Sequence, residues 1–304
     1  MKAGGPAWPN LFVIGAAKCG TTSLHSTLGR HSQVHMSAVK EPHYFAANLH
    51  ATIRRPSAYD YLSEFRANGG AKFLGEASPS YLWDQEAPTR IYESLPDPAE
   101  ARFLVLLRDP VERAHSHYLM DVREGQQQAS FAEAVALDDL MAPRLWGGPC
   151  HLYRDLGQYG SQLNHWLKTW PIDQFLLVET DHIANDAPAA LRRIAAFLGL
   201  SMEEAWMQPV ERKNSYQRPR RLVPSRLLGS DRLRSLSRRA VPRGVRHKVR
   251  DRILMVADER PAITPALRVE LQSFYRSEIE QLRRTSGLEL PTLTSRWGPV
   301  ITEH

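Results

Sequence analysis

Residues 11–23 read LFVIGAAKCGTTS, a run of four apolar residues followed by a loop of small residues, one lysine and three hydroxyl side chains. The apolar run predicts a buried strand, and the periodicity that begins near Thr21 predicts a helix directly after the loop. In such a loop, backbone N–H groups, the positive end of the helix and the ammonium of Lys18 converge. The stretch therefore predicts an anion-binding loop after the first strand of an α/β fold.

The place of the lysine separates this loop from the P-loop of ATP- and GTP-binding proteins. A Walker A loop carries its lysine directly after the last glycine, but Thr21 follows Gly20 here and Lys18 comes two positions before it. This spacing argues against a P-loop nucleotide kinase or NTPase, which stays open as the alternative enzyme class. A tight turn with an incidental lysine is the purely structural alternative.

Other segments extend the same pattern along the chain. Apolar runs at 103–107 and 175–178, and a weaker one at 72–75, predict further strands, each followed by helical periodicity as in βαβ units. A long helix over 266–284 is predicted to pack back on the body. We predict one α/β domain spanning residues 1–304, with a central parallel sheet flanked by helices. Helices are predicted to begin near Thr21, Glu86, Pro110, Ser130, Gln158 and Pro188.

A second motif follows the strand predicted at 103–107. Residues 103–118 read FLVLLRDPVERAHSHY, with Arg108 at the strand end, Asp109 as a helix cap and Pro110 in the first helical turn. Ser116 follows Arg108 by eight residues, so a charged and a hydroxyl donor could hold one phosphate. Taken alone, Arg108 at a strand end also fits a surface ion pair.

Together the two motifs resemble the PAPS-dependent sulfotransferase family, where PAPS is 3′-phosphoadenosine 5′-phosphosulfate. The resemblance implies the P-loop-like sulfotransferase fold, PAPS as donor and its desulfated form, PAP, as product. It implies that the first loop holds the 5′-phosphosulfate and the second motif the 3′-phosphate. The donor-binding residues implied in this way are Lys18, Cys19, Gly20, Thr21, Thr22, Ser23, Arg108 and Ser116.

The same resemblance implies a C-terminal loop over the nucleotide. Residues 212–220 stand at that place in the sequence, and Tyr216, Arg218 and Arg220 are the side chains of this segment that we expect to contact PAPS.

Residues 40–45 read KEPHYF and resemble the segment that supplies the catalytic glutamate in heparan sulfate and related carbohydrate sulfotransferases. The resemblance implies that Glu41 is the general base, while Lys18 stabilises the leaving phosphate. Burial beside Tyr44 and Phe45 would be needed to raise the pKa of a glutamate for this role. His43 is the competing base, because an unshifted histidine titrates near neutrality.

Glu41 also has a simpler interpretation, as a surface carboxylate paired with Lys40 or Arg54. Residues 75–81, GEASPSY, resemble the next segment of the carbohydrate branch, with one departure. Many of those enzymes have a lysine at the position of Ala77. An acceptor-side role for that lysine is therefore missing here or supplied elsewhere.

The charge of the chain is concentrated in one segment. Residues 212–252 hold 15 lysines and arginines but only Asp231 and Asp251 as acids, whereas the whole chain carries a net charge of +6. A solvated face, a mobile flap, contact with an anionic surface, or a non-catalytic anion- or nucleic-acid-binding role all fit this segment. We expect no nucleic acid as partner, because that role would leave the two motifs without a purpose.

The cysteine content, the absence of long apolar stretches and the overall composition indicate the cellular compartment and the source of the protein. Two cysteines, Cys19 and Cys150, cannot form a disulfide framework and suggest no metal site, so we expect a reducing, cytoplasmic compartment and a metal-independent reaction. No apolar stretch is long enough to span a bilayer. An Arg- and Ala-rich composition suits a bacterium of high genomic GC content. The acceptor is predicted to be a hydroxyl or amine of a glycan, a glycolipid or a small molecule, and the oligomeric state is not predicted.

Overall fold

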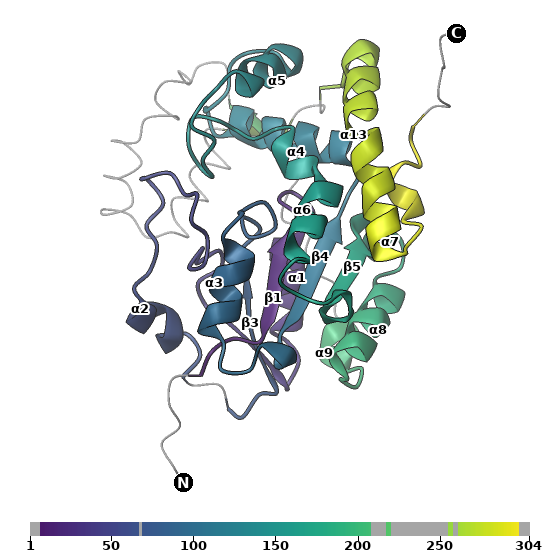
Figure 1. The fold of residues 1–304 in the computed structure, drawn as a ribbon. Helices are drawn as coiled ribbons and strands as arrows, with labels where there is room; N and C mark the ends of the chain where they lie inside the picture. Colours follow the sequence, from purple (N-terminus) through teal and green to yellow (C-terminus); the bar gives the residue numbers. More distant parts are fainter. Residues whose placement is uncertain (1–6, 67–68, 208–216, 220–254, 258–260, 298–304) are drawn as a thin grey trace.

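A computed structural model describes residues 7–66, 69–207, 217–219, 255–257 and 261–297 of the 304-residue chain (Figure 1). Its centre is a five-stranded parallel sheet with the strand order β2-β3-β1-β4-β5. This confirms the predicted α/β fold with a central parallel sheet. The strands are β1 (Leu11–Gly15), β2 (Val34–Met36), β3 (Phe73–Ala77), β4 (Arg102–Leu107) and β5 (Phe175–Glu179).

β1 lies in the middle of the sheet and is buried along its whole length. Leu11 pairs with Gly75 of β3 on one side and with Arg102 of β4 on the other. Strands of a parallel sheet that are covered on both faces read as continuous apolar runs, which is why residues 11–14 are apolar without alternation. The loop after β1 is thereby anchored to the buried centre of the sheet.

Helices flank the sheet, and the predicted starts agree with the observed ones to within about two residues, the usual uncertainty of helix ends. A small antiparallel pair, β6 (Gln217–Pro219) with β7 (Met255–Ala257), lies apart from the main sheet. The helices are α1 (Thr21–Leu28), α2 (Ala58–Ser63), α3 (Ala87–Ser94), α4 (Pro110–Arg123), α5 (Phe131–Asp139), α6 (Tyr159–Trp166), α7 (Thr180–Asn185), α8 (Ala187–Leu198), α9 (Glu204–Met207) and α13 (Pro265–Ser286).

The long helix α13 packs back on the body, as predicted, and runs beside α6 (Figure 1). Leu271, Tyr275 and Ile279 are spaced four residues apart and are buried on its inner face. Within the ranges that the structure describes, no helix is both long and apolar enough to span a membrane.

Candidate functional site

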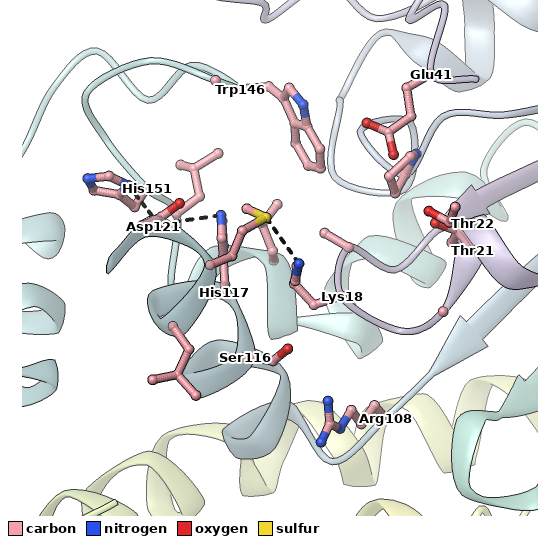
Figure 2. A pocket seen from close by; sticks show the side chains of 18 of the residues that line it. Lys18, Thr21, Thr22, Glu41, Arg108, Ser116, His117, Asp121, Trp146 and His151 are labelled. Carbon is pink, nitrogen blue, oxygen red and sulfur yellow. Dashed lines mark hydrogen bonds and ion pairs between the residues drawn. The ribbon is translucent and has the colours of Figure 1, made fainter. Parts of the chain in front are cut away.

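One cavity of about 690 Å³ opens at the loop that follows β1. Segments far apart in the sequence line it: the β1–α1 loop, the KEPHYF loop at 40–45, one face of α4 and the loop before α6 (Figure 2). Of the site residues predicted from sequence, the cavity brings together Lys18, Gly20, Thr21, Thr22, Ser23, Glu41, Arg108 and Ser116.

The β1–α1 loop presents an open helix N-terminus to this cavity. Gly20 precedes α1 with a φ of 90°, a left-handed conformation that glycine adopts at little cost, and no side chain caps the helix. The first turn of α1 holds no acidic residue. Because first-turn N–H groups have no partner within a helix, those of Thr21 and Thr22 are available to an anion.

Lys18 lies in the middle of the cavity (Figure 2). Its Nζ lies 3.0 Å from the sulfur of Met120, and no carboxylate among the described residues pairs with it. Burial of the ammonium and the nearby guanidinium of Arg123 lower the pKa of Lys18. A partly buried cation without an acidic partner is well suited to bind an anionic ligand.

The second motif lies beside the first. Arg108 follows the end of β4, and Asp109 caps α4 by accepting hydrogen bonds from the backbone N–H groups of Val111 and Glu112 at 2.9 and 3.4 Å. Ser116 lies two turns into the helix on the face that lines the cavity. The guanidinium and the hydroxyl therefore line the same cavity as Lys18, as the sequence predicts.

Cys19 does not reach the cavity. Its side chain is buried, its Sγ lies 3.7 Å from the hydroxyl of Tyr159, and its backbone N–H donates to the carbonyl of Ala16. Thr180, which follows β5, donates to the Cys19 carbonyl at 2.9 Å. Cys19 therefore helps to hold the loop, and neither its thiol nor its N–H is available for direct donor contact.

Glu41 lines the cavity near Trp146 (Figure 2). Its side chain is 38% exposed, so the burial that would make it a stronger base is not found. Its carboxylate is hydrogen-bonded to the Lys40 ammonium and lies 3.8 Å from Nε2 of His43. The pairing expected of a surface carboxylate is thus present in a residue that also faces the cavity. Ala77, where many carbohydrate sulfotransferases have a lysine, is buried, and its carbonyl accepts a hydrogen bond from the Glu41 N–H. The cation beside Glu41 is instead Lys40.

His43 is buried and is not among the residues that line the cavity. Its Nδ1 lies 2.7 Å from the hydroxyl of Ser80, and burial lowers its pKa to about 4. A neutral imidazole with so low a pKa is a weak proton acceptor. The position of His43 suits the orientation of Glu41 better than it suits a base in contact with the acceptor.

A buried carboxylate below supports the KEPHYF loop. Glu76 is fully buried on β3 and accepts hydrogen bonds from Tyr61, Ser78 and Tyr81 at 2.7, 2.6 and 2.8 Å. Ser78 in turn accepts from the His43 N–H at 3.1 Å. Glu41 and His43 both have left-handed φ angles, 61° and 52°, which for such residues is a strained backbone typical of functional sites.

Sequence reasoning missed the wall of the cavity opposite Glu41. It consists of His117 and Asp121 on α4 and of His151 from the loop before α6, while Trp146 from the same loop lies between this wall and Glu41 (Figure 2). His117 directly follows Ser116, and Asp121 is one helical turn further on. That spacing is the one sequence signal that could have found two of them, because residues four apart share a helix face.

The donor contacts predicted in the C-terminal part of the chain fall mostly outside the residues that the structure describes. Tyr216 and Arg220 lie outside the described residues, as does most of the basic segment 212–252. Arg218 belongs to β6, whose backbone lies within 8 Å of α4. The described ranges contain no group of three His, Cys, Asp or Glu side chains placed to hold a metal ion.

Comparison with known proteins points in one direction. The family model described as "Sulfotransferase domain" matches residues 9–285. Carbohydrate sulfotransferase 15 of Rattus norvegicus is 28% identical over 245 residues, which cover 63% of this chain and 44% of that protein. Heparan sulfate glucosamine 3-O-sulfotransferase 6 of Homo sapiens is 30% identical over 203 residues, covering 65% and 55%. The chain thus matches about half the length of these curated relatives.

Solved structures show the same fold. The sulfotransferase from Alicyclobacillus acidocaldarius superimposes with a TM-score of 0.70 at 24% identity, covering 94% of this chain and 99% of that one. The mouse sulfotransferase SULT7A1, solved in complex with PAP, gives a TM-score of 0.50 at 13% identity, covering 92% and 87%.

Proposed function

This chain belongs to the sulfotransferase domain family, and from that membership we propose that it transfers a sulfonate group from PAPS to a hydroxyl or amine of an acceptor, releasing PAP. The acceptor is a glycan, a glycolipid or a small molecule. Two relatives are named as sulfotransferases of carbohydrate and of heparan sulfate, which favours a glycan as the acceptor. We further propose that residues 1–304 act as one domain and that PAPS binds without a metal.

The observation that carries the proposal is the convergence of two anion-binding motifs and one carboxylate on a single cavity. Lys18, Arg108 and Ser116 line the same cavity as the open N-terminus of α1, and Glu41 stands across from them. The first motif suits the 5′-phosphosulfate and the second suits the 3′-phosphate.

In the proposed reaction, the acceptor oxygen attacks the sulfur in line with the bond to the 5′-phosphate. The new S–O bond forms as the old one breaks, and the electron pair leaves with the phosphate oxygen of PAP. Lys18 is placed to neutralise that oxygen, and the N–H groups of Thr21 and Thr22 hold the phosphate. The enzyme thus acts mainly through positioning and charge.

The acceptor proton goes to Glu41 in this scheme. Glu41 faces the cavity, whereas His43 is buried behind it with a pKa of about 4. The Lys40 ammonium holds one carboxylate oxygen, and His43 lies beside the other at 3.8 Å. These neighbours fix the direction in which the carboxylate points. Tyr216, Arg218 and Arg220 stay predicted donor contacts.

Two other functions make different predictions. A nucleotide kinase or NTPase would require Mg²⁺ and ATP, and Thr21 stands where its lysine should be. A non-catalytic anion or nucleic-acid binder would bind through the basic segment 212–252, with affinity that falls steeply with salt.

A transfer assay tests the proposal. Radiolabelled PAPS is incubated without metal and with heparan sulfate, with methyl glycosides or with 2-naphthol, and labelled product is counted. We expect transfer to at least one acceptor, and a Glu41→Gln variant with kcat lowered about 100-fold or more but PAP affinity unchanged. Transfer that needs Mg²⁺, or a Glu41→Gln variant with normal kcat, would refute the mechanism.

A further inference from the structure

The cavity wall opposite Glu41 holds a cluster of titratable side chains for which the sulfonate transfer described above has no use. Asp121 is buried at its centre. One oxygen, Oδ2, accepts a hydrogen bond from the Tyr153 hydroxyl at 2.8 Å and lies 2.9 Å from Nδ1 of His151. The same oxygen is 3.8 Å from Nε2 of His117. Asp121 therefore holds the His151 ring at hydrogen-bond distance and lies close to the His117 ring without bonding to it.

Both rings face the cavity that would receive the acceptor. His117 and His151 line it, and each side chain is 14% exposed. The bond to Asp121 occupies Nδ1 of His151, so its Nε2 remains for a ligand. Nε2 of His117 is too far from Asp121 for a hydrogen bond, and its buried Nδ1 has no hydrogen-bond partner among the described residues. Buried polar atoms without partners are rare and call for an explanation.

The neutral state of His117 suits hydrogen bonding to a neutral polar group. Burial lowers the pKa of His117 to about 4, so this ring is neutral at physiological pH. Burial would lower the pKa of His151 as well, but the hydrogen bond and charge of Asp121 outweigh it and raise that pKa. Burial would raise the pKa of Asp121, but His117, His151 and Tyr153 together hold it below its usual value. Asp121 thus stays ionised and keeps the His151 ring in place.

A flat aromatic surface completes this side of the cavity. Trp146 lies between the histidines and Glu41 at the cavity rim (Figure 2). Its backbone is fixed because its N–H donates to the Asn48 carbonyl at 2.8 Å and its carbonyl accepts from the His50 N–H at 3.0 Å. An aromatic face beside polar hydrogen-bonding groups suits a ring that is apolar on its face and hydroxylated at its edge.

Lys18 lies between the two walls, with Glu41 on one side and His117 on the other (Figure 2). The acceptor oxygen must reach a sulfonate beside Lys18 and give its proton to Glu41. In that position, the substituents next to this oxygen on the acceptor lie toward the histidines. We propose that His117 and His151, the second of which is held by Asp121, hydrogen-bond a second hydroxyl next to the one that is sulfated. The chain is then selective for a vicinal diol on a saturated ring, as in a sugar, over an isolated phenol.

This inference rests on the proposed sulfonate transfer, and binding measurements keep the two apart. Each protein is first titrated with PAP, which tests the donor site. The PAP complex is then titrated with methyl glycosides of glucose, galactose, N-acetylglucosamine and glucuronic acid, with the monodeoxy analogues of the tightest binder, and with 2-naphthol. We expect a glycoside to bind about tenfold more tightly than 2-naphthol, and one deoxy analogue to lose about tenfold.

Variants assign the effect to the histidines. In His117→Phe and His151→Phe, affinity for the intact glycoside should fall about tenfold and the penalty for the missing hydroxyl should disappear, with PAP affinity unchanged. His151→Gln, which keeps a donor near Nε2, should retain part of the selectivity, and Asp121→Asn should lose it. His165→Phe is the matched control, because His165 lies outside the cavity and contacts the Gln85 carbonyl.

The inference is overturned if no glycoside binds the PAP complex, if 2-naphthol binds as tightly as the sugars, or if the histidine variants keep the hydroxyl preference. Failure of the wild-type protein to bind PAP would instead overturn the proposed function, and this inference with it. A purely structural role of the cluster would lower thermal stability and PAP affinity together, and would leave the ratio between glycoside and deoxy analogue unchanged.

Discussion

Lys18 is the residue on which the proposed chemistry depends most. It occupies the centre of the cavity with a left-handed φ of 69°, a conformation that costs free energy for a residue with a side chain. Its ammonium lies against the sulfur of Met120 rather than against a carboxylate. A bound phosphosulfate would replace this weak contact with a charge-assisted hydrogen bond.

The lowered pKa of Lys18 predicts a pH dependence of donor binding. Burial and the nearby Arg123 lower the pKa from the usual 10.5, so the ammonium that attracts the anion is lost at a lower pH than in an exposed lysine. The affinity for PAP should therefore fall as the pH rises through the alkaline range, beginning at a lower pH than it would with an exposed lysine. Calorimetric titration of PAP over this pH range measures the effect.

Lys18→Arg is the control, because a guanidinium stays charged in this range. The variant is expected to bind PAP more weakly at neutral pH but without the alkaline decline. An equal decline in wild type and variant would show that another group titrates, and would contradict this role of Lys18.

At the scale of the elements, α4 connects the two ends of the cavity. Ser116, Met120 and Arg123 lie on the face of the helix that lines the cavity, from the predicted 3′-phosphate site toward the acceptor side. The start of the helix is fixed by Asp109, whose other oxygen accepts from the indole N–H of Trp297 at 3.1 Å. The position of Ser116 therefore depends on a cap two turns away.

Removing this cap should affect both stability and binding. In Asp109→Ala, the N–H groups at the start of α4 lose their acceptor inside the protein, and we expect a loss of about 1–2 kcal/mol in unfolding free energy. PAP affinity should fall as well, because Arg108 directly precedes the cap and Ser116 lies on the helix that the cap fixes. Urea denaturation and calorimetry measure the two effects.

Ser130→Ala is the matched control. Ser130 and Glu133 form a capping box on α5, and neither residue lines the cavity. Its loss should cost about 1 kcal/mol of unfolding free energy and leave PAP affinity unchanged. If both variants weaken PAP binding equally, global destabilisation rather than helix placement is the cause.

Elements with strong local signals were predictable from the sequence. The strand at 11–14 is an unbroken apolar run, and Asp109 with Pro110 marks the start of α4 by cap and proline. The six-residue helix α2 was not among the predicted elements. A segment this short carries little periodicity, and its start is marked mainly by the Ser57 cap.

At the scale of the whole molecule, two buried neutral histidines link folding to pH. Burial lowers the pKa of His43 and of His117 to about 4, against an ordinary value of 6.5. The unfolded chain binds these protons near pH 6.5 and the folded protein only near pH 4. The stability that neutral histidines provide is therefore complete above about pH 6.5 and is lost as the pH falls from there toward about pH 4.

Substitution of these histidines should flatten the acid limb of the stability curve. We expect His43→Asn and His117→Asn each to show a smaller loss of unfolding free energy between about pH 7 and pH 4.5 than the wild type. Urea midpoints at both pH values measure this, with His165→Asn as control. A slope that is identical in all four proteins would mean that neither histidine is held neutral by the fold.

The site could be predicted only as far as its parts are local. The loop with Lys18 and the Arg108 motif are each continuous in sequence and have recognisable chemistry. The histidine cluster and Trp146 are not local: Asp121 on α4 meets His151 thirty residues later, and Trp146 is held by the segment around Asn48. Such contacts arise from tertiary packing, for which a single sequence offers no pattern.

Titration with PAP measures whether this cavity binds the donor nucleotide without a metal. PAP is titrated by calorimetry into the wild type, Lys18→Ala and Arg108→Ala in the presence of a chelator, with ATP and Mg²⁺ as the rival ligand. We predict binding of PAP without metal, weakened at least about tenfold in each variant, and no comparable binding of ATP with Mg²⁺. Absence of PAP binding, or a preference for ATP with Mg²⁺, would contradict the account.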